Sequence, residues 1–389
     1  MRIPTSPVVL IGNYLPDRQF SMQHYSRMLE QNLQAGGANV THITPSERLG
    51  RLSPGNKWLG YIDKLLLFPF QLKKRLATIE SINGKASILH VCDHSNSPLL
   101  KGAKGRQSLL TCHDLIAIRA ALGEFQGEQI RWSGKILQTR IRKAFSIATR
   151  IVCDSRATEQ DLHRIDPSTR NRTQVVHNGF NTTYKKQSRE IIEENLKHLA
   201  LQTAASLILH VGNNAWYKNR LGVLKIFHAF QQIHDKTDVH LIFAGPELDK
   251  VQQAFARTHG IEKNIQCTGP ITSEQLEALY SIADVFLFPS RHEGFGWPPL
   301  EAQSTECPVV ASHNGSLAET LGDSGLTANW DDTAAHSRNL QRILSDSTLR
   351  NSLVSKGLQN ANRFSSSAMT EAFCQIYCEM EEFSTTKPR

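Results

Sequence analysis

The 389-residue chain has no apolar run that could cross a membrane. Its longest candidate, Leu65–Phe70, has six residues and contains a proline, whereas a membrane-spanning helix needs about 20 residues. The opening stretch, Met1–Leu10, carries one arginine and no long apolar segment, so it does not read as a secretory leader. These absences predict a cytoplasmic protein.

Cysteine pairs and common catalytic signatures are also missing. The seven cysteines form no CxxC pair and no Cys/His cluster with zinc spacing, which predicts reduced, mostly buried thiols. No DxD triplet occurs, so the acidic metal clip of metal-dependent transferases is absent. Neither a GxGxxG after a predicted strand, nor a P-loop, nor a GxSxG elbow is present. We therefore expect no metal and no cofactor.

Basic residues are abundant but unevenly distributed. Residues 1–190 carry 28 Lys or Arg and 14 Asp or Glu, a net charge of +14, whereas residues 191–389 carry 16 and 22, a net charge of −6. The asymmetry predicts that the first half meets an anionic partner, such as an acidic membrane surface or an anionic acceptor. Nucleic acid fits on charge alone, and solubility is the alternative without a partner. Two stretches, 58–76 and 131–150, mix basic and aromatic residues as interfacial segments do, although a solvated helix face fits equally well.

Short apolar runs alternate with helix-like stretches throughout, as in parallel sheets covered by helices. In the first half we predict six strands, at 7–12, 38–43, 87–92, 107–112, 150–153 and 173–177. In the second half we predict five, at 206–211, 239–244, 264–267, 285–288 and 308–311. Ligands of such sheets bind beyond the carboxyl ends of the strands, so informative residues should follow strands.

Helical spacing predicts helices at 21–35, 221–234 and 273–282, and the closing stretch 340–383 reads as wholly helical. The polar, Lys/Glu-rich segment 182–202 is predicted as a linker. We therefore divide the chain into an N-terminal domain at 1–185, a C-terminal domain at 200–370, and a helix with a tail at 371–389.

The strongest local signal spans Val285–Val310. A strand ends at Phe288, a loop carrying Glu293 follows, and a helix is predicted to begin at Pro299, where the missing N–H costs nothing. The unpaired N–H groups of such a helix start, together with the helix dipole, suit a diphosphate.

Two glutamates of this segment suggest sugar and ribose contacts. Glu301 is expected in the first helical turn, where its carboxylate can accept hydrogen bonds from both hydroxyls of a ribose, and Glu293 is free on the loop to reach a sugar ring. A helix cap and a surface loop residue are the plain structural alternatives. The expected donor-binding residues of the segment are Gly294, Phe295, Gly296, Pro299, Leu300 and Glu301.

A second signal, Gly212–Asn219, again follows a strand. Lys218 is a compact charge that can pair with phosphate oxygens, and Gly212, Asn213 and Arg220 complete the expected donor side. An exposed lysine at the start of a helix is the structural alternative, but it would oppose the helix dipole.

A third signal lies in the first half, where His113 and Asp114 follow a predicted strand. A neutral imidazole there can hydrogen-bond a sugar hydroxyl or assist proton movement, although a lone histidine is more often structural. Asp114 is expected to orient or to cap. Gly12 and Asn13 occupy the loop after the first strand.

The pair Glu293-x7-Glu301, with its GFG loop and Pro-Leu-Glu-Ala helix start, resembles the retaining glycosyltransferases of the family-4 type. The resemblance extends over nearly the whole chain. It implies the GT-B fold, in which two Rossmann-like α/β/α domains face a central cleft and a C-terminal helix returns to the N-terminal domain. It also implies catalytic roles for Glu293, Lys218 and His113. Gly12, Asn13 and Asp114 are then expected on the side that binds the acceptor.

The sequence departs from the family's commoner pattern near Lys218. Tyr217 stands where many relatives carry arginine, and Asn213 and Asn214 stand where others place one. Arg220 or Arg291 would then have to supply the missing diphosphate-binding cation.

The resemblance implies metal-independent hexosyl transfer from a nucleoside-diphosphate sugar to a saccharide or lipid-linked acceptor, in polysaccharide or glycolipid synthesis. A cytoplasmic enzyme, peripheral on the inner face of the cell membrane, fits the charge asymmetry, and we expect no nucleic-acid partner. The alternatives are an enzyme similar to a nucleotide-sugar epimerase or to glycogen phosphorylase, and a non-catalytic basic module that binds membrane or RNA.

Overall fold

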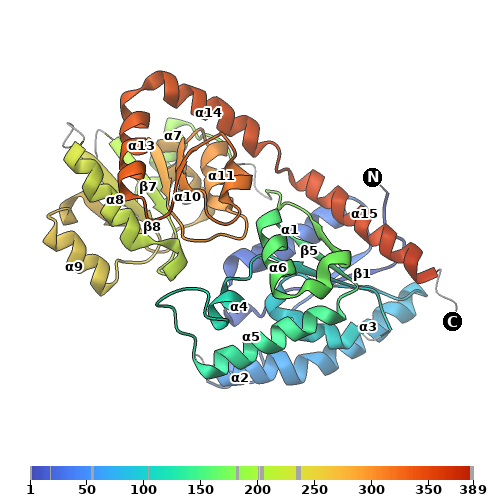
Figure 1. Ribbon diagram of the computed structural model, residues 1–389. Coiled ribbons are helices and arrows are strands. Elements are labelled where there is room, and N and C mark those ends of the chain that lie inside the picture. The colour runs from blue at the N-terminus through green and yellow to red at the C-terminus, as the bar shows by residue number, and fades with distance from the viewer. Residues whose placement is uncertain are drawn as a thin grey trace. The chain divides into compact units, whose positions relative to one another are not determined.

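The computed structural model describes residues 2–17, 19–53, 57–103, 105–180, 184–199, 201, 206–233 and 238–385. The chain forms two compact units (Figure 1). Unit 1 comprises Met1–Asn181 together with Ser365–Arg389, and unit 2 comprises Thr182–Phe364. The predicted return of the C-terminal helix to the first domain is therefore confirmed.

Unit 1 is built on a six-stranded parallel sheet in the order β2-β1-β3-β4-β5-β6. Its strands are β1 (Val8–Ile11), β2 (Val40–Ile43), β3 (Ile88–Val91), β4 (Ser108–Cys112), β5 (Arg150–Cys153) and β6 (Thr173–Val175). Each lies within a predicted strand. The direction in which strands are added reverses between β1 and β3, so the carboxyl ends of these two strands form the switch point at which ligands of such sheets bind.

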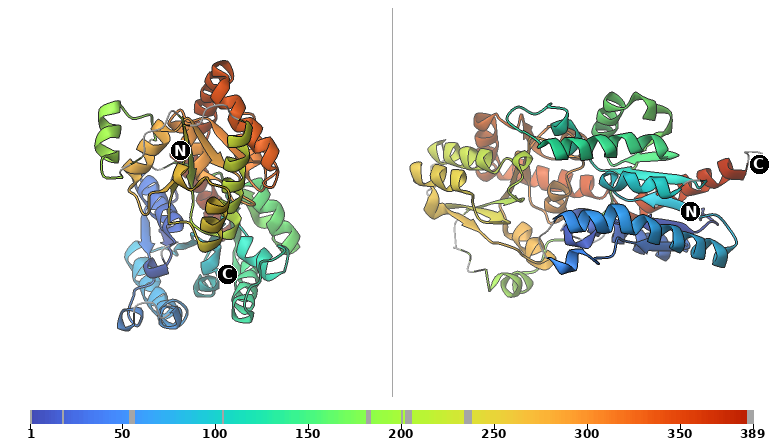
Figure 2. Two further views of the ribbon diagram at one scale, coloured as in Figure 1. Left: turned by 90° about the vertical axis from the view of Figure 1, so that its left-hand side faces the viewer. Right: turned by 90° about the horizontal axis from the view of Figure 1, so that it is seen from below.

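Helices cover both faces of this sheet (Figures 1 and 2). Those of unit 1 are α1 (Phe20–Ala35), α2 (Lys57–Ile62), α3 (Phe68–Asn83), α4 (Ile116–Ala121), α5 (Trp132–Ala144), α6 (Arg156–Ile165) and α15 (Ser366–Thr385). Short helical turns join them at η1 (Leu15–Asp17), η2 (Gly50–Leu52), η3 (Asp63–Leu67), η4 (His94–Ala103), η5 (Phe145–Ile147) and η6 (Pro167–Arg172).

One face of the sheet packs against α3, η4, α5 and α6, whose apolar residues share a single core with those of the strands. Helix α15 belongs to the same unit and contacts α1. The Tyr377 hydroxyl of α15 lies 2.7 Å from His90 Nδ1, and His90 Nε2 lies 2.7 Å from Thr111 Oγ1. These buried contacts fasten the last helix to β3 and β4.

Unit 2 also has a six-stranded parallel sheet, in the order β12-β11-β10-β7-β8-β9. Its strands are β7 (Ser206–Val211), β8 (Val239–Ala244), β9 (Ile265–Cys267), β10 (Val285–Phe288), β11 (Val309–Ser312) and β12 (Leu326–Ala328). This is the Rossmann order, and its switch point lies between β7 and β10.

The helices of unit 2 flank this sheet. They are α7 (Arg189–Leu196), α8 (Arg220–Ile233), α9 (Lys250–Thr258), α10 (Ser273–Ile282), α11 (Trp297–Ser304), α12 (Leu317–Leu321), α13 (Thr333–Ser345) and α14 (Ser347–Ala361), with short turns at η7 (Trp216–Lys218) and η8 (Glu262–Asn264). The predicted two-domain Rossmann-like α/β architecture is confirmed.

The structure corrects several boundaries. The stretch 340–383 is three helices rather than one, because Asp346 caps the start of α14 and the chain changes unit at Ser365. The segment predicted as a linker contains α7, whose Leu196 packs in the core beside Tyr280 of α10. Residues 182, 183, 200 and 202 of that segment, and 234 at the end of a predicted helix, lie outside the described residues.

The seven cysteines are free, as expected, although Cys267 is only partly buried. No helix among the described residues is long and apolar enough to cross a membrane.

Candidate active site

The loops that follow β7 and β10 meet at the switch point of unit 2. The Arg291 backbone N–H donates to the Tyr217 carbonyl at 2.7 Å, and Asn219 Nδ2 donates to the Pro289 carbonyl at 2.8 Å. Asn219 adopts the left-handed conformation at φ 57°, which ends η7 and turns the chain into α8. The two predicted donor loops are therefore held together by one backbone–backbone hydrogen bond and one hydrogen bond from the Asn219 side chain.

Lys218 and Glu293 form an ion pair at this junction. Lys218 Nζ lies 2.9 Å from Oε1 and 3.1 Å from Oε2 of Glu293, and both side chains are largely buried. The Lys218 ammonium also lies 5.1 Å from the centre of the Phe288 ring, at the end of β10. The sequence assigned these residues to two different parts of a substrate, and the structure brings them into direct contact.

The backbone of Glu293 is fixed by the loop after β11. Ser316 donates to the Glu293 carbonyl from its N–H and from its hydroxyl, each at 3.1 Å. Gly315 has φ +65°, and a side chain there would come within 2.5 Å of the Glu293 oxygen. A glycine at 315 is required for this close approach, which places the Glu293 side chain against Lys218.

Helix α11 begins two residues earlier than the sequence suggests. Its cap is Gly296, at φ +102°, and its first residue is Trp297 rather than Pro299. A side chain at Gly296 would clash with Leu317 at 2.6 Å, so this turn also requires glycine. Glu301 consequently lies in the second helical turn and not in the first.

Glu301 is half-buried, and its Oε2 accepts a hydrogen bond of 3.0 Å from the Tyr280 hydroxyl. Burial raises the pKa of Glu301 to about 7, although Tyr280 and the nearby charge of Lys218 oppose the rise. Glu301 therefore changes charge near neutral pH. It interacts electrostatically with Lys218, the lysine that pairs with Glu293.

The other donor-side residues surround Lys218. A side chain at Gly212 would lie 3.5 Å from Lys218 Cγ, and Asn213 Oδ1 accepts from the Ala215 N–H at 3.0 Å, which shapes the loop. Gly294, Phe295, Pro299 and Leu300 are all buried along the β10–α11 connection.

The two arginines proposed as substitute cations are both engaged with the protein. Arg220 is buried, donates to Asn214 Oδ1 at 2.5 Å and stacks over Phe243 at 4.5 Å. Burial holds the pKa of Arg220 below its usual value. The Arg291 guanidinium lies 4.6 Å from the centre of the Trp330 ring. Of the two, only Arg291 lies on the loop that carries Glu293.

In unit 1 the polar residues at the switch point are deeply buried. Asn13, which follows β1, donates from Nδ2 to Asp93, which follows β3. Asn13 Oδ1 in turn accepts from Asn96 Nδ2 at 3.1 Å. Gly12 leaves room for His42, whose Nε2 would lie 2.3 Å from an added side-chain carbon. This predicted acceptor loop is thus packed against its neighbours.

His113 is enclosed by acceptors and by an aromatic ring. Its Nε2 lies 2.9 Å from the Cys92 carbonyl, its Nδ1 lies 3.4 Å from Asp154 Oδ2, and the Tyr25 ring contacts it edge-on at 4.4 Å. Burial alone would lower the pKa of His113, but the carboxylates of Asp154 and Asp93 raise it. Because both nitrogens face oxygen acceptors, this arrangement favours the charged imidazolium over the neutral ring expected from the sequence.

The Asp114 side chain bonds to the backbone of the helix that follows it. Its Oδ1 accepts from the Ile116 N–H at 3.0 Å, at the start of α4.

Sequence reasoning missed several residues that support these sites. Asp93 in unit 1 and Tyr280 in unit 2 are the clearest examples. Asp93 had a usable signal, because it directly follows a predicted strand. Tyr280 had none, since it sits within a helix and meets Glu301 only through the packing of α10 against α11.

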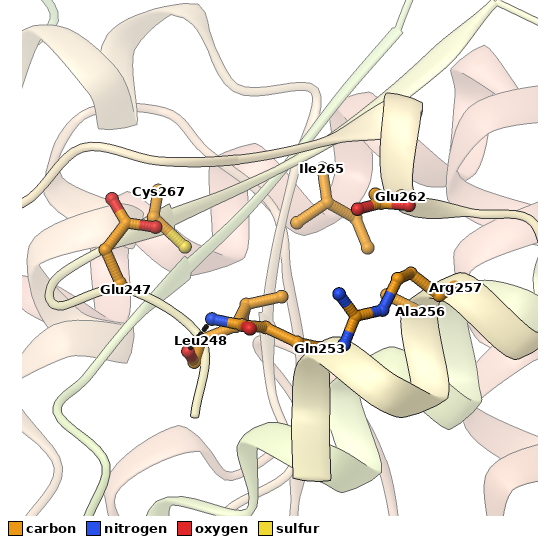
Figure 3. Close-up of a pocket in the computed structure, with 8 residues that line it drawn as sticks. All are labelled: Glu247, Leu248, Gln253, Ala256, Arg257, Glu262, Ile265 and Cys267. Atoms are coloured by element: carbon orange, nitrogen blue, oxygen red, sulfur yellow. Dashed lines mark hydrogen bonds between the residues drawn. The ribbon is translucent and has the colours of Figure 1, made fainter. Parts of the chain in front are cut away.

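A separate shallow cavity of about 230 Å³ lies beside α9 and the β9 edge of unit 2 (Figure 3). Gln253 there donates to the Leu248 carbonyl at 2.7 Å. None of the predicted site residues lines this cavity. Within the part of the chain that the structure describes, no three His, Cys, Asp or Glu side chains converge as a metal site would require.

The fold and the site define a class: a two-unit Rossmann-like protein with a lysine and two glutamates at the switch point of its second sheet. The family described as "Glycosyl transferases group 1" matches residues 191–360, and "Glycosyltransferase Family 4" matches residues 22–184. The chain therefore belongs to the family-4-type glycosyltransferases with the GT-B fold.

Similar proteins agree with this family. The O-antigen chain mannosyltransferase B of Escherichia coli is 42% identical over 161 residues, which are 40% of this chain and 42% of that protein. The D-inositol 3-phosphate glycosyltransferase of Corynebacterium efficiens is 27% identical over 219 residues, 54% of this chain and 51% of that protein. The matches thus span about half or less of the length of these curated relatives.

Among solved structures, the sucrose-phosphate synthase of Thermosynechococcus elongatus has a TM-score of 0.74 at 20% identity. The match covers 97% of this chain and all of that one. The Anabaena protein HepE in complex with UDP has a TM-score of 0.69 at 15% identity, over 96% of this chain and all of that one. Likeness at this identity supports the fold alone.

Proposed function

We propose that the protein is a retaining glycosyltransferase that moves a hexosyl group from a nucleoside-diphosphate sugar to an acceptor hydroxyl. The observation that carries the proposal is the Lys218–Glu293 ion pair beside Glu301, at the switch point of unit 2. A lysine, two carboxylates and the backbone N–H groups of Gly296 and Trp297 offer complementary partners to a diphosphate, a sugar and a ribose.

In this proposal Lys218 exchanges Glu293 for the donor diphosphate when the donor binds. The backbone N–H groups of Gly296 and Trp297, at the start of α11, add a second, uncharged contribution to the same phosphates, because Pro298 and Pro299, which follow them, have no N–H. Glu293, released from the lysine, accepts hydrogen bonds from hydroxyls of the transferred sugar, and Glu301 accepts from the ribose. The ion pair keeps both side chains oriented before the donor arrives, which lowers the cost of organising the site.

Bond making and breaking occur on one face of the sugar. The bond from the anomeric carbon to the diphosphate oxygen breaks, and a bond to the acceptor oxygen forms on the same side. The acceptor proton passes to the departing phosphate oxygen, so no covalent enzyme intermediate is needed. Lys218 stabilises the charge that develops on the leaving group, and we propose that no metal is required.

Unit 1 is proposed to supply the acceptor side. His113 is held by Asp154 and the Cys92 carbonyl, which occupy both of its nitrogens, so we propose that it acts through its positive charge rather than as a base. The named activity of the 42% identical relative makes mannose the first donor sugar to test and a polysaccharide or glycolipid intermediate the first acceptor class. We place the reaction in the cytoplasm.

The test is a donor screen with the purified chain. Uridine, guanosine and adenosine diphosphate hexoses are each incubated with oligosaccharide and lipid-linked acceptors, with and without a chelator. Release of nucleoside diphosphate that requires acceptor, and a product with the donor's anomeric configuration by proton NMR, are the expected results. Glu293→Gln is expected to abolish transfer, whereas Glu262→Gln, an exposed glutamate of unit 2, leaves it unchanged.

Other outcomes would redirect the proposal. Conversion of the donor sugar without release of nucleoside diphosphate would indicate an epimerase-like enzyme. An inverted product would remove the retaining mechanism, and loss of transfer with the chelator would remove metal independence. A non-catalytic module would show no turnover in any mixture. It would bind membrane or RNA without a donor, and Glu293→Gln would leave that binding unchanged.

A further inference from the structure

The outer faces of α2–α3 and α5 in unit 1 expose large apolar side chains. Trp58, Phe70 and Trp132 are 71%, 77% and 75% exposed, and Leu66 and Ile136 are exposed as well. Single exposed apolar residues are ordinary on protein surfaces, but groups of them on neighbouring helices mark interaction sites.

These helices present their exposed faces to the same side of unit 1. Leu72 of α3 and Ile141 of α5 are buried in one core, under the same face of the sheet, so the opposite faces of both helices point away from it. Helix α3 and helix α5 flank η4 on that side (Figures 1 and 2). Helices that connect parallel strands run back along the sheet. Trp58 and Trp132, at the start of their helical segments, therefore lie toward the carboxyl edge of the strands.

Each helix carries its exposed residues in one stripe with the same order. On α5, Trp132 and Ile136 come first, and Arg140 and the exposed Lys143 follow at helical spacing. On η3 and α3, Leu66 and Phe70 come first and the exposed Lys73 and Lys74 follow. Both stripes thus pass from apolar to cationic along the helix.

Acidic residues are almost absent from these segments. Residues 131–150 contain none, and residues 57–76 contain only Asp63. Asp63 is buried and accepts from the backbone N–H groups of Arg48, Leu49 and Gly50. Lys64 is paired with Asp17 at 2.6 Å, and Glu80, further along α3, is paired with Arg106. The two segments offer their exposed cations no accessible carboxylate of their own, whereas an ordinary solvated surface mixes both signs.

We propose that this surface, called the docking face, binds a bilayer that contains anionic lipids. It consists of Trp58, Leu66, Phe70, Trp132 and Ile136 with the exposed cations Lys73, Lys74, Lys135, Arg140 and Lys143. Aromatic and aliphatic side chains insert at the boundary between headgroups and acyl chains, and the cations are attracted to acidic headgroups. The inference does not depend on the proposed function.

Other occupants fit the docking face less well. Leu66 and Ile136 gain little from a nucleic-acid backbone, which recognises cations and stacked rings. A second copy would bring its own unbalanced cations against this face, and like charges oppose such an interface. A lipid surface satisfies both the apolar and the cationic residues.

The experiment is vesicle sedimentation with the full chain. Vesicles of phosphatidylcholine alone are compared with vesicles that contain about one third phosphatidylglycerol, at about 0.1 M salt and at high salt. We expect binding to the anionic vesicles only, weakened at high salt. Phe70→Ser with Trp132→Ser is expected to weaken binding about tenfold or more, and Lys73→Ala with Lys74→Ala roughly fivefold for each cation removed.

Matched controls come from exposed residues of unit 2. Val251→Ser replaces a 64% exposed apolar side chain, and Lys250→Ala with Lys263→Ala removes two exposed cations, and these are expected to leave vesicle binding unchanged. Circular dichroism checks that each variant is folded.

Several results would overturn the proposal. Failure to bind anionic vesicles at low salt, or equal weakening by the unit 2 controls, excludes a docking face at this place. Binding to single-stranded RNA that Phe70→Ser with Trp132→Ser abolishes, without vesicle binding, assigns the face to nucleic acid. A dimer in solution that the same variant dissociates assigns it to a second copy.

Discussion

The two switch points of the molecule have the same topology but differ in how their polar residues are enclosed. In unit 1, Asn13, Asp93 and Asp154 are 1%, 3% and 2% exposed. Asn13 donates a hydrogen bond to Asp93, and Asp154 faces His113. In unit 2, the side chains of Lys218 and Glu293 are 16% and 9% exposed and contact each other. The first cluster is closed by the protein, whereas the second is more accessible, and we propose that it exchanges its internal partner for a ligand.

This difference teaches that position after a strand is not enough to identify a binding residue. Both sheets place polar side chains at their carboxyl edges, as the fold class requires. The oppositely charged pair Lys218–Glu293 in unit 2 is partly accessible, and we propose that a donor separates it, whereas the pair His113–Asp154 in unit 1 is buried. We therefore expect substitutions in unit 2 to change activity, and substitutions in unit 1 to change stability first.

After the loss of transfer proposed for Glu293→Gln, the largest expected effect is on turnover when Lys218 is replaced. Lys218→Ala removes the charge proposed to stabilise the leaving diphosphate, and loss of one such group typically lowers turnover by about 10²–10³-fold. Steady-state kinetics with the donor found in the screen measure the change. Lys225→Ala, an exposed lysine on α8, is the control. Similar activity of both variants would show that Lys218 does not contact the leaving group.

A smaller effect, on stability, is expected at Glu301. Its pKa is raised from 4.5 to about 7 in the folded protein, so the folded state binds the proton more tightly than the unfolded state. Stability therefore falls as pH rises between these values, by up to about 3 kcal/mol at pH 8. Glu301→Gln removes this penalty.

Denaturant unfolding at several pH values tests this expectation. The variant should be more stable than the parent chain at pH 8, and the difference should shrink toward zero near pH 4.5. Weaker nucleotide binding by the same variant would accompany the gain. A parent chain whose stability is flat between pH 5 and 8 would contradict the raised pKa.

In unit 1, Asp154→Asn is expected to lower stability by about 2 kcal/mol, because it removes the charge that faces the buried His113. Since the pKa of His113 is raised in the folded protein, its stabilising contribution is present below pH 6.5 and is lost as pH rises through the folded pKa. The loss in the variant should therefore be larger at pH 6 than at pH 9. NMR titration of the imidazole provides the direct measurement, and an unchanged His113 pKa in the variant would refute the coupling.

The smallest effect is expected at Asp114. Its carboxylate accepts from Ile116 at the start of α4, and loss of such a bond costs about 1 kcal/mol. Asp114→Ala should lower the thermal midpoint slightly and leave the Michaelis constant for the acceptor unchanged. A large rise in that constant would restore Asp114 to the acceptor side, as the sequence suggested.

Strands were the most predictable part of the fold. Buried parallel strands are short apolar runs, and β5, β7, β8 and β10 have the bounds that the sequence predicts. Strand β12 was missed because Leu326–Ala328 has three residues and little apolar character. Helix α7 was missed because its surface is polar and its single buried residue, Leu196, meets α10 only in the tertiary structure.

The candidate site was predictable in composition but not in contacts. Glycines, glutamates and a lysine after strands indicated the right loops, yet nothing in the sequence pairs Lys218 with residue 293, which lies 75 positions away. The role of Gly315 depends on a carbonyl of another loop, and the charge state of His113 depends on two carboxylates from other strands. Such properties arise only when the chain is folded.

Helix α15 belongs to unit 1 but follows unit 2 in the chain, so it is synthesised after all of unit 2. Unit 2 is one continuous segment, whereas the sheet of unit 1 receives α15, with Tyr377 against His90, from the final residues. On the ribosome, the second half of the chain can finish folding while the first half still lacks one of its covering helices. The half made first is thus the half completed last.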